Sequence, residues 1–138
     1  MGFWFESPLS AEENLEQADK YFEAGYADLK DRAYYYDDLN MAINCYDNLC
    51  KALDYYKKAR ELYFGSDDFY TCERCTENIS ACEHNIKIAK TNVAECYMNE
   101  AIRLWNNYDY DEARRMREKA SEWDRDASDF VDDDTWEL

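Results

Sequence analysis

The chain has 138 residues and a formal net charge of −16, because 32 Asp and Glu stand against 16 Lys and Arg. This length suits one domain, and three Gly with one Pro are too few for an all-β fold rich in turns. No apolar run reaches the ~18 residues of a membrane span. The first six residues do not resemble a secretory signal, and so acidic a chain is a poor direct ligand for nucleic acid. We therefore expect a cytoplasmic protein without membrane attachment.

The first predicted helix begins at Ser10. Ser10 and Glu13 have the spacing of a capping box, in which each side chain accepts a hydrogen bond from the other residue's backbone N–H. Apolar residues at helical spacing follow as far as Phe22. Gly25 either ends this helix or only weakens it, because glycine has a low helix propensity. The sequence leaves both outcomes open.

A second helix is predicted over residues 27–64, with a break near Asp37 and Asp38. Its apolar residues recur at spacings of three and four, which is the pattern of a buried helical stripe. This apolar seam consists of Tyr36, Leu39, Ile43, Tyr46, Cys50 and Leu53. Ala42 and Leu49 each lie one residue before a seam position and widen the stripe.

Gly65 marks the turn to a third helix, predicted over residues 67–106 and ~60 Å long. Gly65 suits the position just after a helix, Ser66 suits an N-cap, and Asp67 and Asp68 favour the positive end of the helix dipole. The seam of this helix continues through three heptads. It consists of Cys75, Ile79, Cys82, Ile86, Ala89, Val93 and Cys96.

A fourth helix is predicted from Asp109 to about residue 128, and Asp109 with Glu112 again has the spacing of a capping box. Residues 129–138 hold five acids and no base. We therefore expect a single helical domain of residues 1–128, followed by a loose acidic tail.

These elements predict an all-α fold, an elongated helical bundle built on a long antiparallel two-helix hairpin with shorter flanking helices. The first and fourth helices should join the hairpin at the end far from Gly65, which leaves two helices beside the Gly65 turn. The acidic segments 10–50 and 122–138 should then gather at the four-helix end. A second copy of the chain could cover the thin end, so a homodimer is one expected state.

Residues 97–120 resemble the helix–turn–helix of a tetratricopeptide repeat. The resemblance is carried by the segments 101–104, 108–113 and 118–120. The residues that match the family's pattern of aromatic, small and large apolar positions are Tyr97, Ala101, Leu104, Ala113 and Ala120. The residues that depart from it are Glu100, Arg117 and Arg125. The resemblance implies a helical hairpin, whereas the peptide groove of that family needs several repeats, and the chain shows no second copy.

Six cysteines raise the hypothesis of a zinc site made by Cys72, Cys75, Cys82 and His84. On a continuous helix, however, Cys75 and Cys82 are ~10 Å apart, and His84 points to the opposite side from Cys75. We therefore predict no metal and no other cofactor, and we keep a small structural zinc protein as an alternative. Cysteines at seam positions fit reduced core residues, and an inter-helix disulfide stays open.

No sequence feature predicts catalysis. His84 is the single histidine, and the three glycines stand too far apart for a phosphate-binding loop. Carboxylates are so numerous that no acid–base pair stands out. We predict that the protein is not an enzyme.

The thirteen tyrosines exceed what one seam can bury, and exposed Tyr beside carboxylates is typical of protein-binding surfaces. We predict an acidic nucleic-acid mimic that docks on the basic, nucleic-acid-handling surface of a partner protein and blocks it. In size and charge the chain is similar to small phage anti-defence inhibitors, including anti-CRISPR proteins. The predicted contact residues are Glu12, Glu13, Glu16, Asp28, Asp31, Tyr34, Tyr35, Asp37 and Asp38. The alternative is a tetratricopeptide-like scaffold or adaptor that binds a peptide or protein through a helical groove.

Overall fold

The computed structural model describes residues 8–30, 33 and 35–124. Within them the chain forms helices and no strand, so the all-α prediction is confirmed. The described elements are α1 (Ala11–Lys30), a short 3₁₀ turn (Tyr36–Asp38), α2 (Leu39–Gly65), α3 (Phe69–Asn106) and α4 (Tyr110–Trp123). None of these helices is long and apolar enough to cross a membrane. The predicted acidic tail lies outside the described residues.

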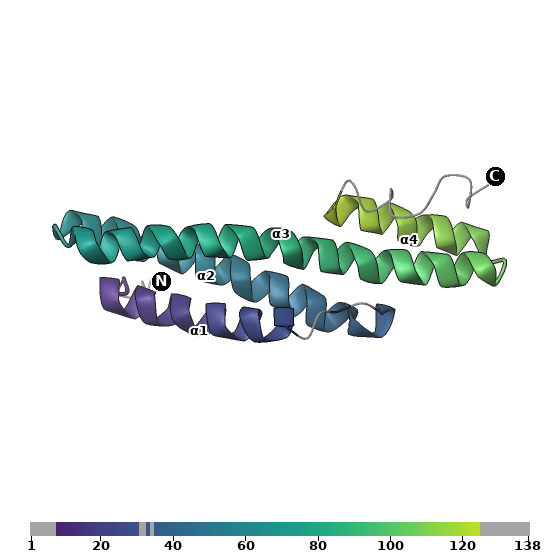
Figure 1. Cartoon of the computed structure of the whole chain (residues 1–138), viewed down its shortest axis with the longest axis horizontal. Helices are drawn as coiled ribbons and strands as arrows, with labels where there is room; N and C mark the ends of the chain where they lie inside the picture. Colours follow the sequence, from purple (N-terminus) through teal and green to yellow (C-terminus); the bar gives the residue numbers. More distant parts are fainter. Residues whose placement is uncertain (1–7, 31–32, 34, 125–138) are drawn as a thin grey trace, which may run out of the picture.

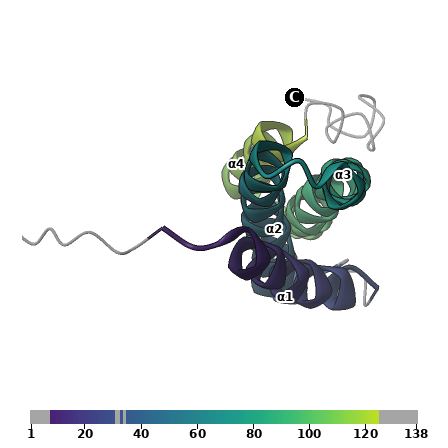
Figure 2. The ribbon, with the colours of Figure 1, turned by 90° about the vertical axis from the view of Figure 1, so that its left-hand side faces the viewer.

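The helix α3 spans the length of the molecule, and the shorter helices are staggered along it (Figure 1). α1 lies at the half nearer the α2–α3 turn, and α4 lies at the other half, on opposite sides of the α2–α3 pair (Figure 2). The prediction that only two helices lie beside the Gly65 turn, with the first and fourth helices together at the other end, is therefore wrong. α1 begins beside the Gly65 turn and continues to Lys30 before the chain reverses into α2. At its start, Ala11 and Leu15 pack against Tyr63 and Cys75.

The start of α1 is the predicted capping box. The Ser10 N–H donates to Glu13 Oε1 at 3.0 Å, and the Glu13 N–H donates to Ser10 Oγ at 3.1 Å. The backbone hydrogen bond from Ser10 holds the pKa of Glu13 below its usual value. The buried Asn14 side chain also donates hydrogen bonds from Nδ2 to the Leu9 and Ser10 carbonyl oxygens, at 3.2 and 2.9 Å. Four hydrogen bonds thus fix where this helix begins.

Gly25 lies inside α1 and does not end it, so the predicted start of the second helix at residue 27 is wrong. α1 instead continues to Lys30 and α2 begins at Leu39, so the interval between them includes the predicted break at Asp37 and Asp38. A Cβ atom at Gly25 would lie 2.8 Å from Leu49 Cγ and 3.3 Å from the Cys45 carbonyl oxygen. The Cys45 thiol also donates to the Gly25 carbonyl at 3.2 Å. Glycine is therefore needed here because the backbones of α1 and α2 approach closely.

We expect Gly25→Ala to lower the free energy of unfolding by about 1–2 kcal/mol, because overpacking costs more than alanine's better helix propensity returns. Gly65→Ala is the matched control. Gly65 is the last residue of α2, has a negative φ, and leaves open space where a Cβ would stand. That substitution should raise the same free energy by up to about 1 kcal/mol. Urea denaturation of both variants checks the prediction, and a shift of the same sign in both would contradict it.

The most buried residues of α2 each lie one position before a residue of the predicted seam or continue that row. Its buried residues are Ala42, Cys45, Leu49, Ala52, Tyr56, Ala59 and Tyr63. Tyr36 of the predicted seam is exposed. The other predicted seam residues are only half-buried: Leu39, Ile43, Tyr46, Cys50 and Leu53. α2 lies between α1 and α3, so its innermost line is the one that both neighbours approach, and small residues there allow close contact. The larger apolar residues flank this line.

The seam of α3 is confirmed, since every predicted position is buried except the half-buried Ile86. Core residues later in α2 pack with core residues earlier in α3. Leu49 belongs to one core cluster with Ala89, and Tyr56 to the next with Cys82. The two helices therefore contact each other along most of the length of α2.

The turn between α2 and α3 differs from the prediction in its chemistry. Gly65 is still helical, and the residue with a left-handed backbone is Asp67, with φ of 61°. The N-cap of α3 is Asp68 rather than Ser66, because Asp68 Oδ1 accepts the Thr71 N–H at 3.1 Å. The short Asp side chain tolerates the left-handed conformation, so the turn does not need a glycine there.

The last helix, α4, ends at Trp123 rather than near residue 128. Asp109 is its N-cap residue, but the side chain accepts no capping hydrogen bond, so the predicted second capping box is wrong. At the other end the Trp123 ring packs edge-on against Tyr46, with 5.1 Å between ring centroids. Asp124 then takes an extended backbone and accepts a hydrogen bond from Thr91 at 2.8 Å. These contacts to α2 and α3 end the helix.

Candidate protein-binding surfaces

The excess of acid in the described helices is concentrated on α1. This helix holds six carboxylates and two lysines. By contrast, α2 has three acids and four bases, α3 has five and four, and α4 has four of each. A formal charge of −16 for the whole chain therefore does not describe a uniformly negative rod. The α2–α4 framework is close to neutral, and α1 is a negative stripe on its surface.

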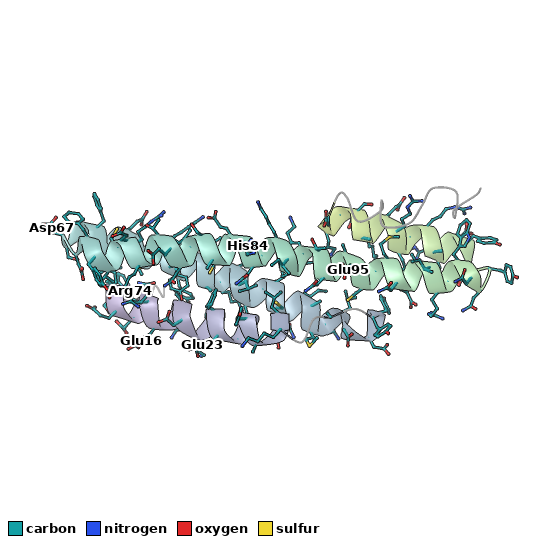
Figure 3. The ribbon with its side chains drawn as sticks, in the orientation of Figure 1. Glu16, Glu23, Asp67, Arg74, His84 and Glu95 are labelled. Atoms are coloured by element: carbon teal, nitrogen blue, oxygen red, sulfur yellow. The ribbon has the colours of Figure 1, made fainter. Side chains whose placement is uncertain are left out.

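The outer face of α1 carries the carboxylates that are free to meet another molecule. Glu12, Glu16 and Glu23 are exposed, and Figure 3 shows Glu16 and Glu23 pointing away from the bundle. Seven residues separate these two, so they lie on one side of the helix, ~10 Å apart along its axis. The opposite side of α1 holds the buried Ala18 and Gly25, which pack on α2.

A short hydrogen bond ties the acidic helix to its neighbour. The Tyr56 hydroxyl donates to Asp19 Oδ1 at 2.5 Å, which joins α2 to α1. Burial, followed by this bond to Asp19, raises the pKa of Tyr56. Because Tyr56 is itself buried, the bond fixes the rotation of α1 and thereby the direction of its exposed carboxylates.

The predicted contact residues at the start of α1 have different roles. Glu12 and Glu16 are exposed on the outer face, whereas the Glu13 carboxylate is engaged in the capping box. All three lie beside the Gly65 turn, because α1 begins there. The expectation that the acidic segment 10–50 gathers at the end far from Gly65 is therefore wrong, whereas most of the segment 122–138 lies outside the described residues.

The other predicted contacts that the structure describes lie near or beyond the far end of α1, ~28 Å from its start. Asp28 is half-buried, and Asp37 is exposed. Tyr35 is 66% exposed and donates its N–H to Asp38 Oδ2 at 3.2 Å, so Asp38 helps to form the turn before α2. Asp31 and Tyr34 fall outside the described residues. The structure thus divides the described members of the predicted contact set into two groups and does not bring them together.

The cysteines and the histidine do not converge. Cys75 and Cys82 are buried in the core face of α3, Cys72 is half-buried, and His84 is exposed (Figure 3). Within the part of the chain that the structure describes, no three His, Cys, Asp or Glu side chains are placed to hold a metal ion. All six cysteines are free thiols. Burial raises the pKa of Cys82 to about 12, which makes this thiol a poor nucleophile at neutral pH.

No family model, curated protein or solved structure matches the chain. Fold class alone does not specify a function. The functional interpretation therefore rests on the surfaces that the helices present.

Sequence reasoning expected an uncovered end at the α2–α3 turn, but it did not identify the residues that are exposed there. Large apolar side chains are exposed there: Leu62 (44%), Phe64 (62%), Phe69 (56%) and Tyr70 (75%). We call these four residues the apolar tip. Figure 3 locates it through the label on Asp67, which lies in the same turn. The sequence pattern that could have revealed it is a pair of phenylalanines flanking the turn at positions outside both seams.

Proposed function

We propose that the protein is a non-enzymatic binding protein whose acidic α1 face docks on the basic, nucleic-acid-handling surface of a partner and blocks it. The observation that supports the proposal is the placement of surplus carboxylates on the outer side of one helix, above a nearly neutral framework. Lys and Arg side chains that normally meet phosphates would meet Glu12, Glu16 and Glu23 instead. The protein would act as a nucleic-acid mimic.

In this proposal α2 and α3 serve as the long antiparallel hairpin that supports the acidic helix. Gly25 and the bond between Tyr56 and Asp19 hold α1 against α2 in one orientation. A rigid row of charges loses less conformational entropy on binding than the same charges on a loop. The α1 face is therefore better suited to docking than the carboxylates of the turns.

Exposed ion pairs contribute little affinity, but they accelerate association. We expect reversal of three charges, in the variant Glu12→Lys/Glu16→Lys/Glu23→Lys, to lower the association rate constant for the partner about 10–100-fold at low salt. The rate of the unmodified protein should fall steeply as salt rises, because a Debye length of ~8 Å at physiological salt screens exposed charges. The measurement is surface plasmon resonance with a basic partner captured from the cell of origin.

The matched control is Glu77→Lys/Glu83→Lys, which reverses two exposed carboxylates on α3. This variant should associate at close to the unmodified rate. Duplex DNA or RNA added as competitor should displace the protein from its partner. A partner that binds the α1 variant and the α3 variant equally well would contradict the proposal, as would simultaneous binding of the protein and nucleic acid.

A second candidate function is a tetratricopeptide-like adaptor. The observation that favours it is the contact between α3 and α4, where Ala101, Ala113 and Ala120 are fully buried in one cluster with Tyr97. Small residues at this contact allow the two helices to approach closely. An adaptor that holds a peptide by apolar contacts would bind with an affinity that hardly responds to salt, and this separates it from the first candidate.

A further inference from the structure

The apolar tip is not needed to form the turn on which it stands. The backbone of the turn is already closed by hydrogen bonds from Ser66 N to the Leu62 carbonyl (3.1 Å) and from Asp68 N to the Tyr63 carbonyl (3.0 Å). The side chain of Asp68 caps α3 in addition. The Phe64 and Phe69 rings touch edge-to-face, with 5.6 Å between centroids, yet each remains more than half exposed. Their exposure therefore calls for another explanation.

The exposed area suits the centre of an interface with a partner. Aromatic side chains have 150–250 Å² to bury, so these exposed fractions correspond to roughly 500 Å² for the apolar tip, which is the size of apolar patch that is often functional on a monomer. A standard protein–protein interface buries ~800 Å² on each side. The apolar tip alone is thus too small for a stable dimer, but it is large enough for an apolar centre within a polar rim.

The surroundings of the tip indicate the charge of the partner. Within about one helical turn of the tip residues, the carboxylates are Glu61, Asp67, Asp68 and Glu73. Across the contact with α1, Glu12 raises the pKa of Tyr63 further after burial, which places Glu12 beside this end of α2. Lys58, Arg60 and Arg74 lie within the same distance and offset three of these five negative charges. A second copy would bring the same excess of carboxylates to the contact and would be repelled, whereas a basic rim on another protein would be attracted.

We propose that Leu62, Phe64, Phe69 and Tyr70 form the apolar anchor that enters a hydrophobic pocket bordered by Lys or Arg side chains on the partner protein. This inference rests on the proposed function and specifies it. The start of the acidic α1 face and the anchor lie at the same end of the molecule, so one partner surface can meet both. Charge then provides the fast encounter, and burial of the two phenylalanines provides most of the affinity.

The test begins with a photo-crosslinking amino acid at position 64, 69 or 108, expressed in the cell of origin. Tyr108 is the matched control, because it is an 80% exposed aromatic residue in the turn at the opposite end of α3. We expect the same protein to be crosslinked from positions 64 and 69 and not from 108. Failure to crosslink a protein from position 64 or 69 would overturn the anchor.

The crosslinked protein, once identified by mass spectrometry and purified, is titrated with defined variants at 50 and 300 mM salt. We expect Phe64→Ser/Phe69→Ser to weaken binding at least 100-fold at both salt concentrations. Tyr108→Asn should change affinity less than twofold. Circular dichroism and thermal melting verify that the tip variant is folded, which is expected because both rings are exposed.

The outcomes separate the anchor from the proposed function. Unchanged binding by the tip variant, with salt-sensitive binding retained, overturns the anchor and leaves the acidic docking face standing. Loss of binding in the tip variant, without any effect of salt or of the α1 charge reversal, overturns the acidic docking and the basic border of the pocket. Crosslinking only to a second copy, with a dimer in sedimentation equilibrium, overturns the heterologous partner in favour of self-association.

Discussion

Raising the pH from 8 to 11 is expected to unfold the protein. Burial raises the pKa of Cys45 and Cys96 to about 11 and that of Cys82 to about 12, whereas an unfolded thiol ionises near ~8.5. The folded state therefore keeps protons that the unfolded state releases. The stability that these thiols contribute is complete below pH ~8.5 and is lost as the pH rises toward their folded pKa values.

The expected effect is large because three thiols act together. Between the unfolded and folded pKa values, each thiol lowers the free energy of unfolding by ~1.4 kcal/mol per pH unit. Over two pH units the three thiols together lower it by about 8 kcal/mol, which is comparable to the whole stability of a typical domain. Tyr56, whose pKa is also raised by burial, adds to the loss above pH ~10.

Urea denaturation from pH 7 to pH 10.5, under reducing conditions, measures this slope. Cys82→Ala should flatten the slope by about a quarter, since it removes one of four buried thiols; the fourth is Cys75, whose pKa is also raised by burial. Cys72→Ala, at a half-buried position on the same helix, is the matched control. A free energy of unfolding that stays constant between pH 7.5 and 10 would show that these thiols do not titrate as their burial requires.

Truncating Leu49 to alanine is expected to cost 2–5 kcal/mol of unfolding free energy. Leu49 is completely buried where three helices meet. It packs with Phe22 and Leu29 of α1 and with Ala89 of α3 in one cluster. The cavity would therefore be enclosed on both sides, and no single helix could move to fill it without losing its other contacts. Leu62→Ala, at an exposed position on the same helix, should cost much less.

The contact with Gly25 makes this prediction sharper. A methyl group at Gly25 collides with the Leu49 side chain, so removing that side chain makes room for it. The loss of unfolding free energy in the double variant Gly25→Ala/Leu49→Ala should therefore be smaller than the sum of the losses in the two single variants, by about 1 kcal/mol or more. Thermal and urea unfolding of the four proteins in this cycle measure the coupling. Strict additivity would mean that the two positions do not touch.

Two features that depend on a single helix were predicted correctly, whereas the N-cap of α3 was predicted at Ser66 and lies at Asp68. The capping box of Ser10 and Glu13 formed because both partners lie within one helical turn. The seam of α3 was predicted because a heptad pattern on one helix needs no knowledge of its neighbours. The box at Asp109 failed even at this range, and there the left-handed Tyr108 sets a different entry into α4.

Features that depend on several helices were not predicted. α2 has two adjacent sets of apolar residues at heptad spacing, the predicted seam and the set that contains Ala52 and Ala59. Only the contacts with α1 and α3 decide that the second set is the most deeply buried. Gly25 could have been a helix end, and the close approach of Leu49 explains why it is not.

For this protein the sequence alone determined the helical class, the extent of α3 and the acidic excess, because helix propensity, periodicity and charge are properties of the chain itself. Only the tertiary structure decided where α1 docks, and with it which acids share a face and which phenylalanines remain uncovered. Those outcomes depend on competition among apolar helix faces for the same partners, and residues distant in the sequence settle that competition.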